Sequence, residues 1–196
     1  MAEIRSTLDM VMERAAKMAA ESTKEVKDDS LVHEGMRLAA DYLKGSEDSL
    51  MTILQKQEKE KQKAILEGMT ATLLRNIVLP RDEFLLEGSL KSLAAITEIG
   101  PDEVLTVCQE LHQILNQYSQ HKEQSQNQLD DAIRSQLEQK LAEQGTQLTE
   151  DMSINPAMHP QYREELERML TGLNGQYNDA LDQRKQLIRQ HLATAL

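Results

Sequence analysis

The sequence contains no tryptophan, one phenylalanine and one cysteine among its 196 residues. A single cysteine excludes an intramolecular disulfide framework. Aromatic residues make up only 3% of the chain, which argues against a β-sandwich or β-barrel because strands are normally rich in aromatic and β-branched side chains. The sequence also lacks the roughly 18 consecutive apolar residues of a membrane-spanning helix. These absences favour a helical protein without membrane insertion.

Basic residues are scarce relative to acidic ones. The chain has 22 Lys and Arg against 33 Asp and Glu, which gives a net charge of −11 at pH 7. A chain of this charge without a basic block repels phosphate backbones and anionic lipids, so we expect no nucleic-acid partner and no membrane partner. Residues 1–5 carry charge from the third position and lack an apolar segment, so no secretion signal is expected. We therefore predict a cytoplasmic protein.

The residue types that are abundant are good helix formers: Leu, Ala, Glu, Gln, Lys and Met. We predict an all-α fold with a helical bundle in residues 1–100. Residues 101–196 are predicted to form a long antiparallel, coiled-coil-like helical hairpin. The two segments form either separate domains or one packed domain.

Apolar spacing predicts four helices in the first half of the chain. They are expected over residues 2–22, 30–44, 47–78 and 84–96. Gly45 is expected to end the second helix. The third contains the polar run 56–63, which could stay helical through charged pairs that contribute a few tenths of a kcal/mol each. The fourth is apolar around much of its circumference, so we expect it to be the most buried.

The second half begins at Pro101, and the run that follows it as far as Gln144 contains neither Gly nor Pro and keeps a seven-residue apolar spacing. A helix of this length would extend roughly 65 Å, so part of it must project or be covered by a partner. Its seam is weakest between Gln117 and Gln128. The last helix, from Tyr162 to Leu192, changes phase beside Gly172–Gly175, through either a four-residue stutter or a true break.

The apolar and tyrosine positions of these two predicted helices form a candidate seam, which could be used within the hairpin or by a partner. Its members are Leu111, Leu115, Tyr118, Leu129, Leu166, Leu173, Tyr177 and Leu181.

Motifs for catalysis are absent from the sequence. It has no Gly-rich phosphate loop, no Gly-x-Ser-x-Gly elbow, and no acidic residue three positions before any of its five histidines. We therefore expect no enzymatic activity and no cofactor. One pair has metal-ligand spacing: Cys108 and His112 lie four residues apart, and sulfur with imidazole suits zinc or copper. Two ligands make half a site, and the competing interpretation, which we adopt, is a core cysteine with a flanking histidine.

The opening residues 1–13, from Met1-Ala2-Glu3 to Met12-Glu13, resemble the start of a family of small uncharacterised bacterial proteins from sulfate- and metal-reducing anaerobes. The resemblance implies a bacterial, cytoplasmic, helical protein. It implies no activity, and no functional residue can be carried over from it.

Together these features favour a non-enzymatic scaffold or adapter that acts through coiled-coil-like contacts with another protein or with a second copy of itself as a homo-oligomer. The alternative is a metal- or small-ligand-sensing helical bundle that uses Cys108 and His112.

Overall fold

A computed structural model describes residues 29–46, 49–143 and 155–194, and within these ranges the regular secondary structure is helical throughout. The all-α prediction is confirmed. The helix expected over residues 2–22 lies outside the described residues. The helices run over residues 29–44, Leu50–Gln55 (α2), Lys59–Asn76 (α3), Glu83–Ile99 (α4), Asp102–Glu143 (α5), Pro156–Met158 (η1, a 3₁₀ turn) and Tyr162–Thr194 (α6).

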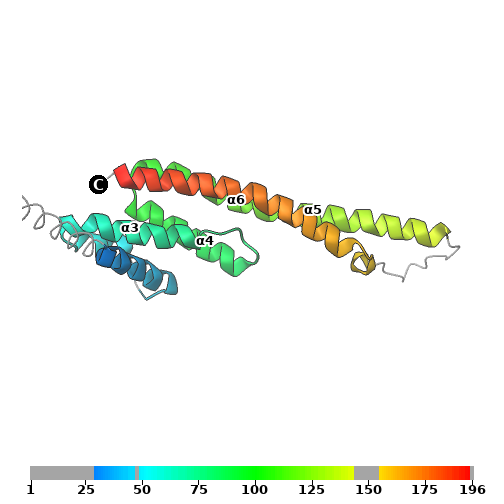
Figure 1. Ribbon diagram of the computed structural model, residues 1–196, viewed down its shortest axis with the longest axis horizontal. Helices are drawn as coiled ribbons and strands as arrows, with labels where there is room; N and C mark the ends of the chain where they lie inside the picture. Colours follow the sequence, from blue (N-terminus) through cyan, green and yellow to red (C-terminus); the bar gives the residue numbers. More distant parts are fainter. Residues whose placement is uncertain (1–28, 47–48, 144–154, 195–196) are drawn as a thin grey trace, which may run out of the picture.

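The molecule is long and narrow (Figure 1). α5 and α6 run antiparallel to each other along it, and the shorter helices gather at one end. We call this thick end, the described residues of 29–126 together with 171–194, the base. The remainder, residues 127–143 of α5 with residues 155–170, is called the arm. In the part of the chain that the structure describes, none of the helices is both long and apolar enough to cross a bilayer.

The helix over residues 29–44 ends where the sequence predicts. Gly45 adopts a φ of +85°, and its amide donates to the Tyr42 carbonyl at 2.9 Å while the Ser46 amide donates to the Asp41 carbonyl at 2.9 Å. Glycine adopts this left-handed conformation without steric cost, so it satisfies the last carbonyls of the helix and turns the chain.

The single helix expected over residues 47–78 is wrong, because the chain breaks between α2 and α3. The Glu58 carbonyl accepts from the amides of Lys61 (2.8 Å) and Gln62 (3.1 Å), while the Gln62 side chain donates to the Gln57 carbonyl at 3.0 Å. The polar run has no apolar face to hold it against the core, and the charged pairs that could have kept it helical are individually weak. Local hydrogen bonds therefore start a new helix there.

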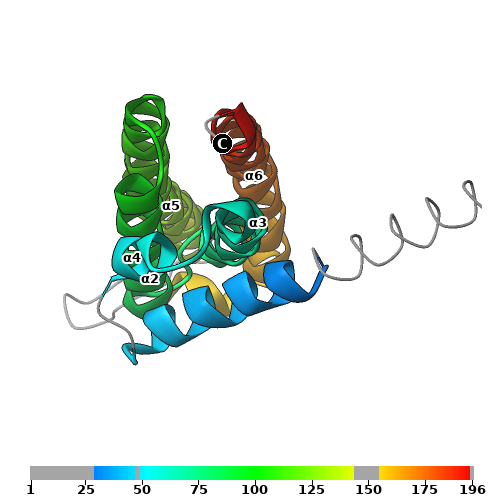
Figure 2. The ribbon, with the colours of Figure 1, turned by 90° about the vertical axis from the view of Figure 1, so that its left-hand side faces the viewer.

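α3, and not α4 as the sequence suggested, is the central helix of the base. Viewed along the long axis, it lies between the helix over 29–44, α4, α5 and α6 (Figure 2). Four of its large apolar side chains are fully buried, against one in α4. The α3 side chains are Ile65, Met69, Leu73 and Leu74. In α4, Asp82 caps the first turn, and Phe84 in that turn is 81% exposed.

The helix over 29–44 crosses α3 at a pair of glycines. A Cβ on Gly35 would lie 2.0 Å from the Ile65 carbonyl oxygen, and a Cβ on Gly68 would lie 1.9 Å from the Val32 carbonyl oxygen. Such an approach of two helix backbones is possible only without side chains at both positions. The crossing brings the first described helix onto the core, which also includes side chains of α4, α5 and α6.

α5 and α6 are each continuous. α5 spans 42 residues, about 63 Å at 1.5 Å per residue, so the predicted long helix is confirmed. α6 runs through Gly172 and Gly175 without interruption, which excludes the break, and the stutter stays a prediction. Before α6, the His159 carbonyl accepts from the Tyr162 amide at 3.0 Å, which leads the chain into the helix.

Candidate functional site

The hairpin of α5 and α6 is held in register by polar contacts spread along its length. An ion pair joins Glu110 to Arg184 within the base, and the Tyr162 hydroxyl donates to the Asp130 carboxylate at 2.6 Å within the arm. Contacts at both ends of this stretch keep the two helices aligned over about six turns. The two helices pair antiparallel along this stretch.

Between these contacts lies a cluster of aromatic and polar side chains. The Tyr118 hydroxyl donates to Asn174 Oδ1 at 2.7 Å, and its ring meets that of Tyr177 edge to face with centroids 5.4 Å apart. The Tyr177 hydroxyl is hydrogen-bonded to His121 Nδ1 at 2.5 Å. Burial raises the pKa of Tyr118, against the positive charge of Arg81, and burial also raises the pKa of Tyr177. The stretch of weak apolar seam is thus filled by side chains that satisfy one another.

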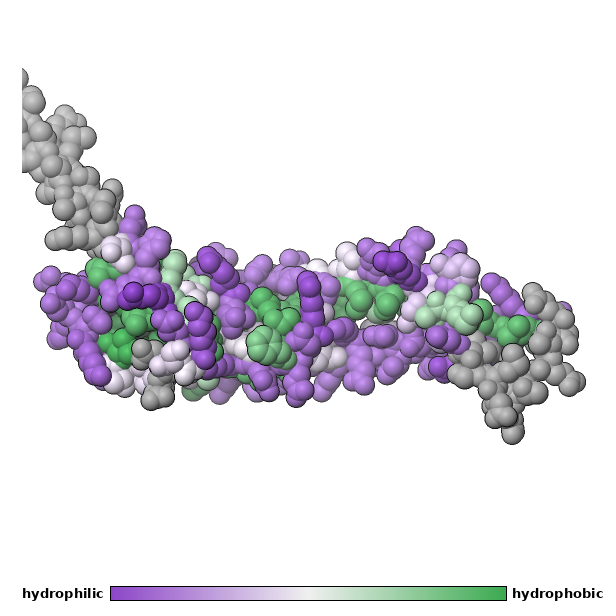
Figure 3. All heavy atoms as spheres, turned by 90° about the horizontal axis from the view of Figure 1, so that it is seen from below, coloured by the Kyte–Doolittle hydropathy of each residue, from purple (hydrophilic) through white to green (hydrophobic). Residues whose placement is uncertain are grey.

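The arm has a much thinner core than the base. Of its described residues, Ile133 (1% exposed) and His159 (7% exposed) are buried. Its other large apolar side chains lie half-buried between α5, η1 and α6, apart from Met158 of η1, which is 81% exposed. The half-buried ones are Leu129, Leu137, Leu141, Leu166, Met169 and Leu170. Apolar patches consequently reach the surface between polar ones along this end of the molecule (Figure 3).

The candidate seam residues separate into two groups by burial. The buried members are Leu111, Leu115, Tyr118 and Leu181, and the half-buried members are Leu129, Leu166, Leu173 and Tyr177. The first group contacts the core of the chain itself, so a partner could not reach those side chains while the base is folded. A role of the second group in partner binding stays a prediction, and the geometry restricts it to surfaces that the base leaves open.

A model described as "Family of unknown function (DUF6657)" matches residues 51–190, more than two-thirds of the chain. The chain belongs to this family. The match starts within α2 and ends near the end of α6, so it includes most of the base core and the whole described arm. It supports the expected kinship with a helical family of unknown function, but on residues other than the opening 13, and the suggested bacterial source is still a prediction. No curated protein and no solved structure matches the chain.

In this DUF6657 chain the two candidate metal ligands lie in different surroundings. Cys108 is 4% exposed in the core between α4 and α5, and burial raises the pKa of its thiol while Thr97 lowers it. His112, one turn further along α5, lies at the surface. Among the described residues no group of three or more His, Cys, Asp and Glu side chains converges. Burial of Cys108 agrees with the core-cysteine interpretation, and zinc or copper binding gains no support from the geometry.

Sequence reasoning missed a groove between the helix over 29–44, α3 and α4. It encloses about 710 Å³, and Lys44, Arg75 and Lys91 lie along it together with the exposed Phe84. The Lys91 ammonium is already occupied, since it donates to the Leu43 carbonyl at 3.0 Å. No signal in the sequence marks this groove, because a single Phe in an apolar helix has the pattern of a core residue.

Proposed function

We propose that this protein is a non-enzymatic bacterial scaffold or adapter of the cytoplasm, in which the base is a rigid support and the arm contacts a helical protein partner. The observation that carries the proposal is the contrast in burial between the two parts of one continuous hairpin. In the base, α4 packs on α5 and α3 packs on α6, whereas in the arm α5 and α6 cover only each other and η1.

Half-buried leucines are an unused source of binding energy. Full burial of a Leu or Met side chain is worth about 1.5–3 kcal/mol relative to exposure, and each half-buried side chain of the arm has realised only part of this. A third helix laid along the arm would cover the open sides of Leu129, Leu137 and Leu166 together. This is the way an amphipathic helix binds an apolar groove, and the partner would be either another protein or the arm of a second copy.

Charged side chains border the apolar positions of the arm. Arg134 pairs with Asp131 at 3.2 Å on α5, and Arg168 pairs with Glu164 at 3.1 Å on α6, all exposed. Such exposed pairs add little stability to the hairpin itself. At the rim of a helical interface, charges of both signs instead restrict which partner and which orientation fit.

The test uses two neighbouring substitutions of equal charge in α5. Leu137→Glu places a carboxylate on a half-buried apolar position, while Gln136→Glu places one on the exposed side of the same turn. We expect Leu137→Glu to weaken association at least about tenfold, because a charge buried at an interface without a partner costs more than 1.4 kcal/mol. Gln136→Glu should leave association unchanged, and both variants should keep the helical circular dichroism spectrum.

Association is measured in two ways. Sedimentation velocity over a range of concentrations reports pairing with a second copy, and a photo-crosslinker at Gln139 in the arm, compared with one at Thr106 in the base, reports a different partner in cell extract. A crosslinked partner supports the proposal only if Leu137→Glu abolishes the adduct and Gln136→Glu retains it. The proposal would be contradicted if the protein is a monomer at all concentrations and the crosslinkers in the arm and in the base give the same products.

A further inference from the structure

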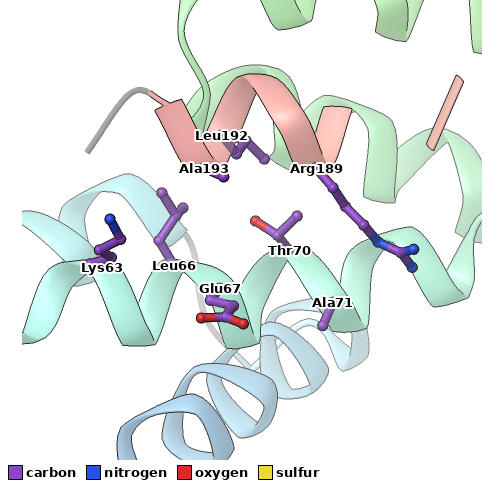
Figure 4. A pocket seen from close by; sticks show the side chains of 8 residues that line it. All are labelled: Lys63, Leu66, Glu67, Thr70, Ala71, Arg189, Leu192 and Ala193. Carbon is purple, nitrogen blue, oxygen red and sulfur yellow. The ribbon is translucent and has the colours of Figure 1, made fainter. Parts of the chain in front are cut away.

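A cavity of about 350 Å³ lies in the base between α3 and the last turns of α6 (Figure 4). Its walls are largely apolar and include Leu66 and Ala71 of α3 and Leu192 of α6. The volume is at the lower end of the 300–1,000 Å³ range of small-molecule sites. It lies away from the arm, so what it binds is independent of the proposed partner contact.

The cavity contains a buried hydroxyl without a hydrogen-bond partner. Thr70 is 5% exposed, and its Oγ1 is the buried side-chain polar atom that no described group satisfies. Such an atom costs about 1–3 kcal/mol. The other fully buried hydroxyls of the described residues are satisfied: Ser89 bonds the backbone of Asn76 and Val78, and Ser92 bonds Gly88 and the Asn76 side chain.

Threonine in a helix usually avoids this cost by donating to the carbonyl four residues earlier. Thr97 does so, to the Leu93 carbonyl at 3.0 Å, and Thr194 does so, to the Gln190 carbonyl at 3.2 Å. Thr70 does not, and Figure 4 shows its side chain directed away from α3 and across the cavity toward α6. The hydroxyl therefore lies beside the cavity without a hydrogen-bond partner among the described residues.

Two cations line the same cavity at opposite sides of Thr70, and one carboxylate, that of Glu67, also lines it. Lys63 lies toward one end and Arg189 toward the other, and Arg189 is the nearer to Thr70 in Figure 4. Neither takes part in an ion pair within the described chain. Burial lowers the pKa of Lys185, one turn before Arg189; Asp182 opposes this, and the charge of Arg189 adds to it. An anion beside Arg189 would relieve that repulsion.

From these observations we propose that the cavity binds a small aliphatic carboxylate. Its hydrocarbon part would lie against Leu66 and Leu192. Its carboxylate would accept a hydrogen bond from Thr70 and pair with Arg189, whose planar fork suits two carboxylate oxygens. The carboxylate supplies the acceptor that Thr70 lacks, and the pairing gives an anion a favourable place on a chain whose net charge of −11 otherwise repels it.

The test titrates hexanoate and octanoate into the full-length protein by isothermal calorimetry, with 1-octanol as the uncharged probe. We expect saturable binding of octanoate that weakens at least about tenfold in Thr70→Val and in Arg189→Gln, since each removes a charge-assisted hydrogen bond. The matched controls Thr72→Val and Arg168→Gln should bind as the wild type does, because neither residue lines the cavity.

A second measurement needs no ligand. Thr70→Val keeps the side-chain shape and removes the orphaned hydroxyl, so it should raise the Tm of the free protein by about 2–4 °C. The proposal is overturned if wild-type protein binds neither carboxylate up to millimolar concentration. It is also overturned if 1-octanol binds as tightly as octanoate, or if Thr70→Val retains binding and leaves the Tm unchanged, since water would then satisfy the hydroxyl.

Discussion

Cys108 on α5 faces Thr97 on α4, and burial holds the pKa of its thiol above the ordinary value of 9.0. The folded protein therefore keeps a proton that the unfolded chain loses once the pH passes about 9. The resulting stability is fully present below that pH and is lost as the pH rises toward the folded-state pKa. A group that looked like half of a metal site thus has a measurable effect on folding without any metal.

We predict that the free energy of unfolding falls between pH 8 and 9.8 in the wild type by up to about 1.4 kcal/mol per pH unit from this thiol. Cys108→Ala should remove this part of the slope. Urea denaturation of both proteins across the range is the measurement. Staying below pH 10 avoids the tyrosines, and the opposite contribution of Lys185 cancels in the comparison. Parallel curves would show that the thiol is accessible to water.

At single positions the sequence was informative where a side chain had one plausible environment. Cys108 on an apolar stripe was correctly expected in the core. The surroundings of Phe84 and Thr70 were not predicted correctly, because they depend on how the neighbouring helices are placed. Phe84 lies exposed along the groove between the helix over 29–44, α3 and α4, and the unpartnered hydroxyl of Thr70 faces α6, about 120 residues later in the chain.

Among the elements, the crossing of the helix over 29–44 with α3 has the sharpest consequence for mutation. Gly68→Ala would place a methyl group 1.9 Å from the Val32 carbonyl oxygen, so the helices must separate. We expect a loss of at least about 2 kcal/mol in the free energy of unfolding, as in overpacked cores. Chemical denaturation followed by circular dichroism measures it.

The matched control is the same substitution in α6. A Cβ on Gly172 or Gly175 would meet nothing within 4 Å, so Gly172→Ala and Gly175→Ala should each stabilise the protein by about 0.5–1 kcal/mol through helix propensity. If Gly175→Ala destabilises the protein as much as Gly68→Ala does, α6 must be covered at Gly175 by a surface that we have not described. If Gly68→Ala leaves the free energy of unfolding unchanged, the two helices are not in close contact at the crossing.

Helix ends marked by Gly or Pro were predictable, as at Gly45 and at Pro101 before α5. The break between α2 and α3 was not, because it has no such marker. Weak charged pairs favour one continuous helix there, whereas a break allows both Leu54 and Ile65 to be buried. Which of the two is more stable depends on tertiary packing, which the sequence pattern does not show. Amphipathic spacing also does not predict which helix is surrounded by the others, so the sequence did not identify α3 as the central helix of the base.

At the scale of the whole molecule, the length of α5 can be measured directly. Thr106 and Gln139 are both exposed on this helix, 33 residues apart, which corresponds to about 50 Å. Spin labels at cysteines in these positions, in the Cys108→Ala background, should give a distance near 50 Å by electron–electron double resonance. A pair at Thr106 and Gln190 should give a short distance, since packed helices lie about 8–10 Å apart.

A short distance for Thr106 and Gln139 would mean that α5 bends back at the weak part of its seam, between Gln117 and Gln128, and that the arm does not project. The sequence predicted a helix too long for a compact molecule, since the run without Gly or Pro is visible in it. It could not say which part projects, because that depends on α3 and α4 covering only one end.

α5 runs unbroken from the base through the arm, and α6 is paired with it from Tyr162 onward, so the length of the paired helices fixes a distance. Each residue adds about 1.5 Å, and removing seven residues from α5 together with the seven that face them in α6 would bring the tip about 10.5 Å closer to the base while the remaining side chains keep their faces. The number of heptads beyond the base therefore sets the distance from the base to the far end of the arm, in steps and not continuously, and with it the reach of the partner contact that we propose.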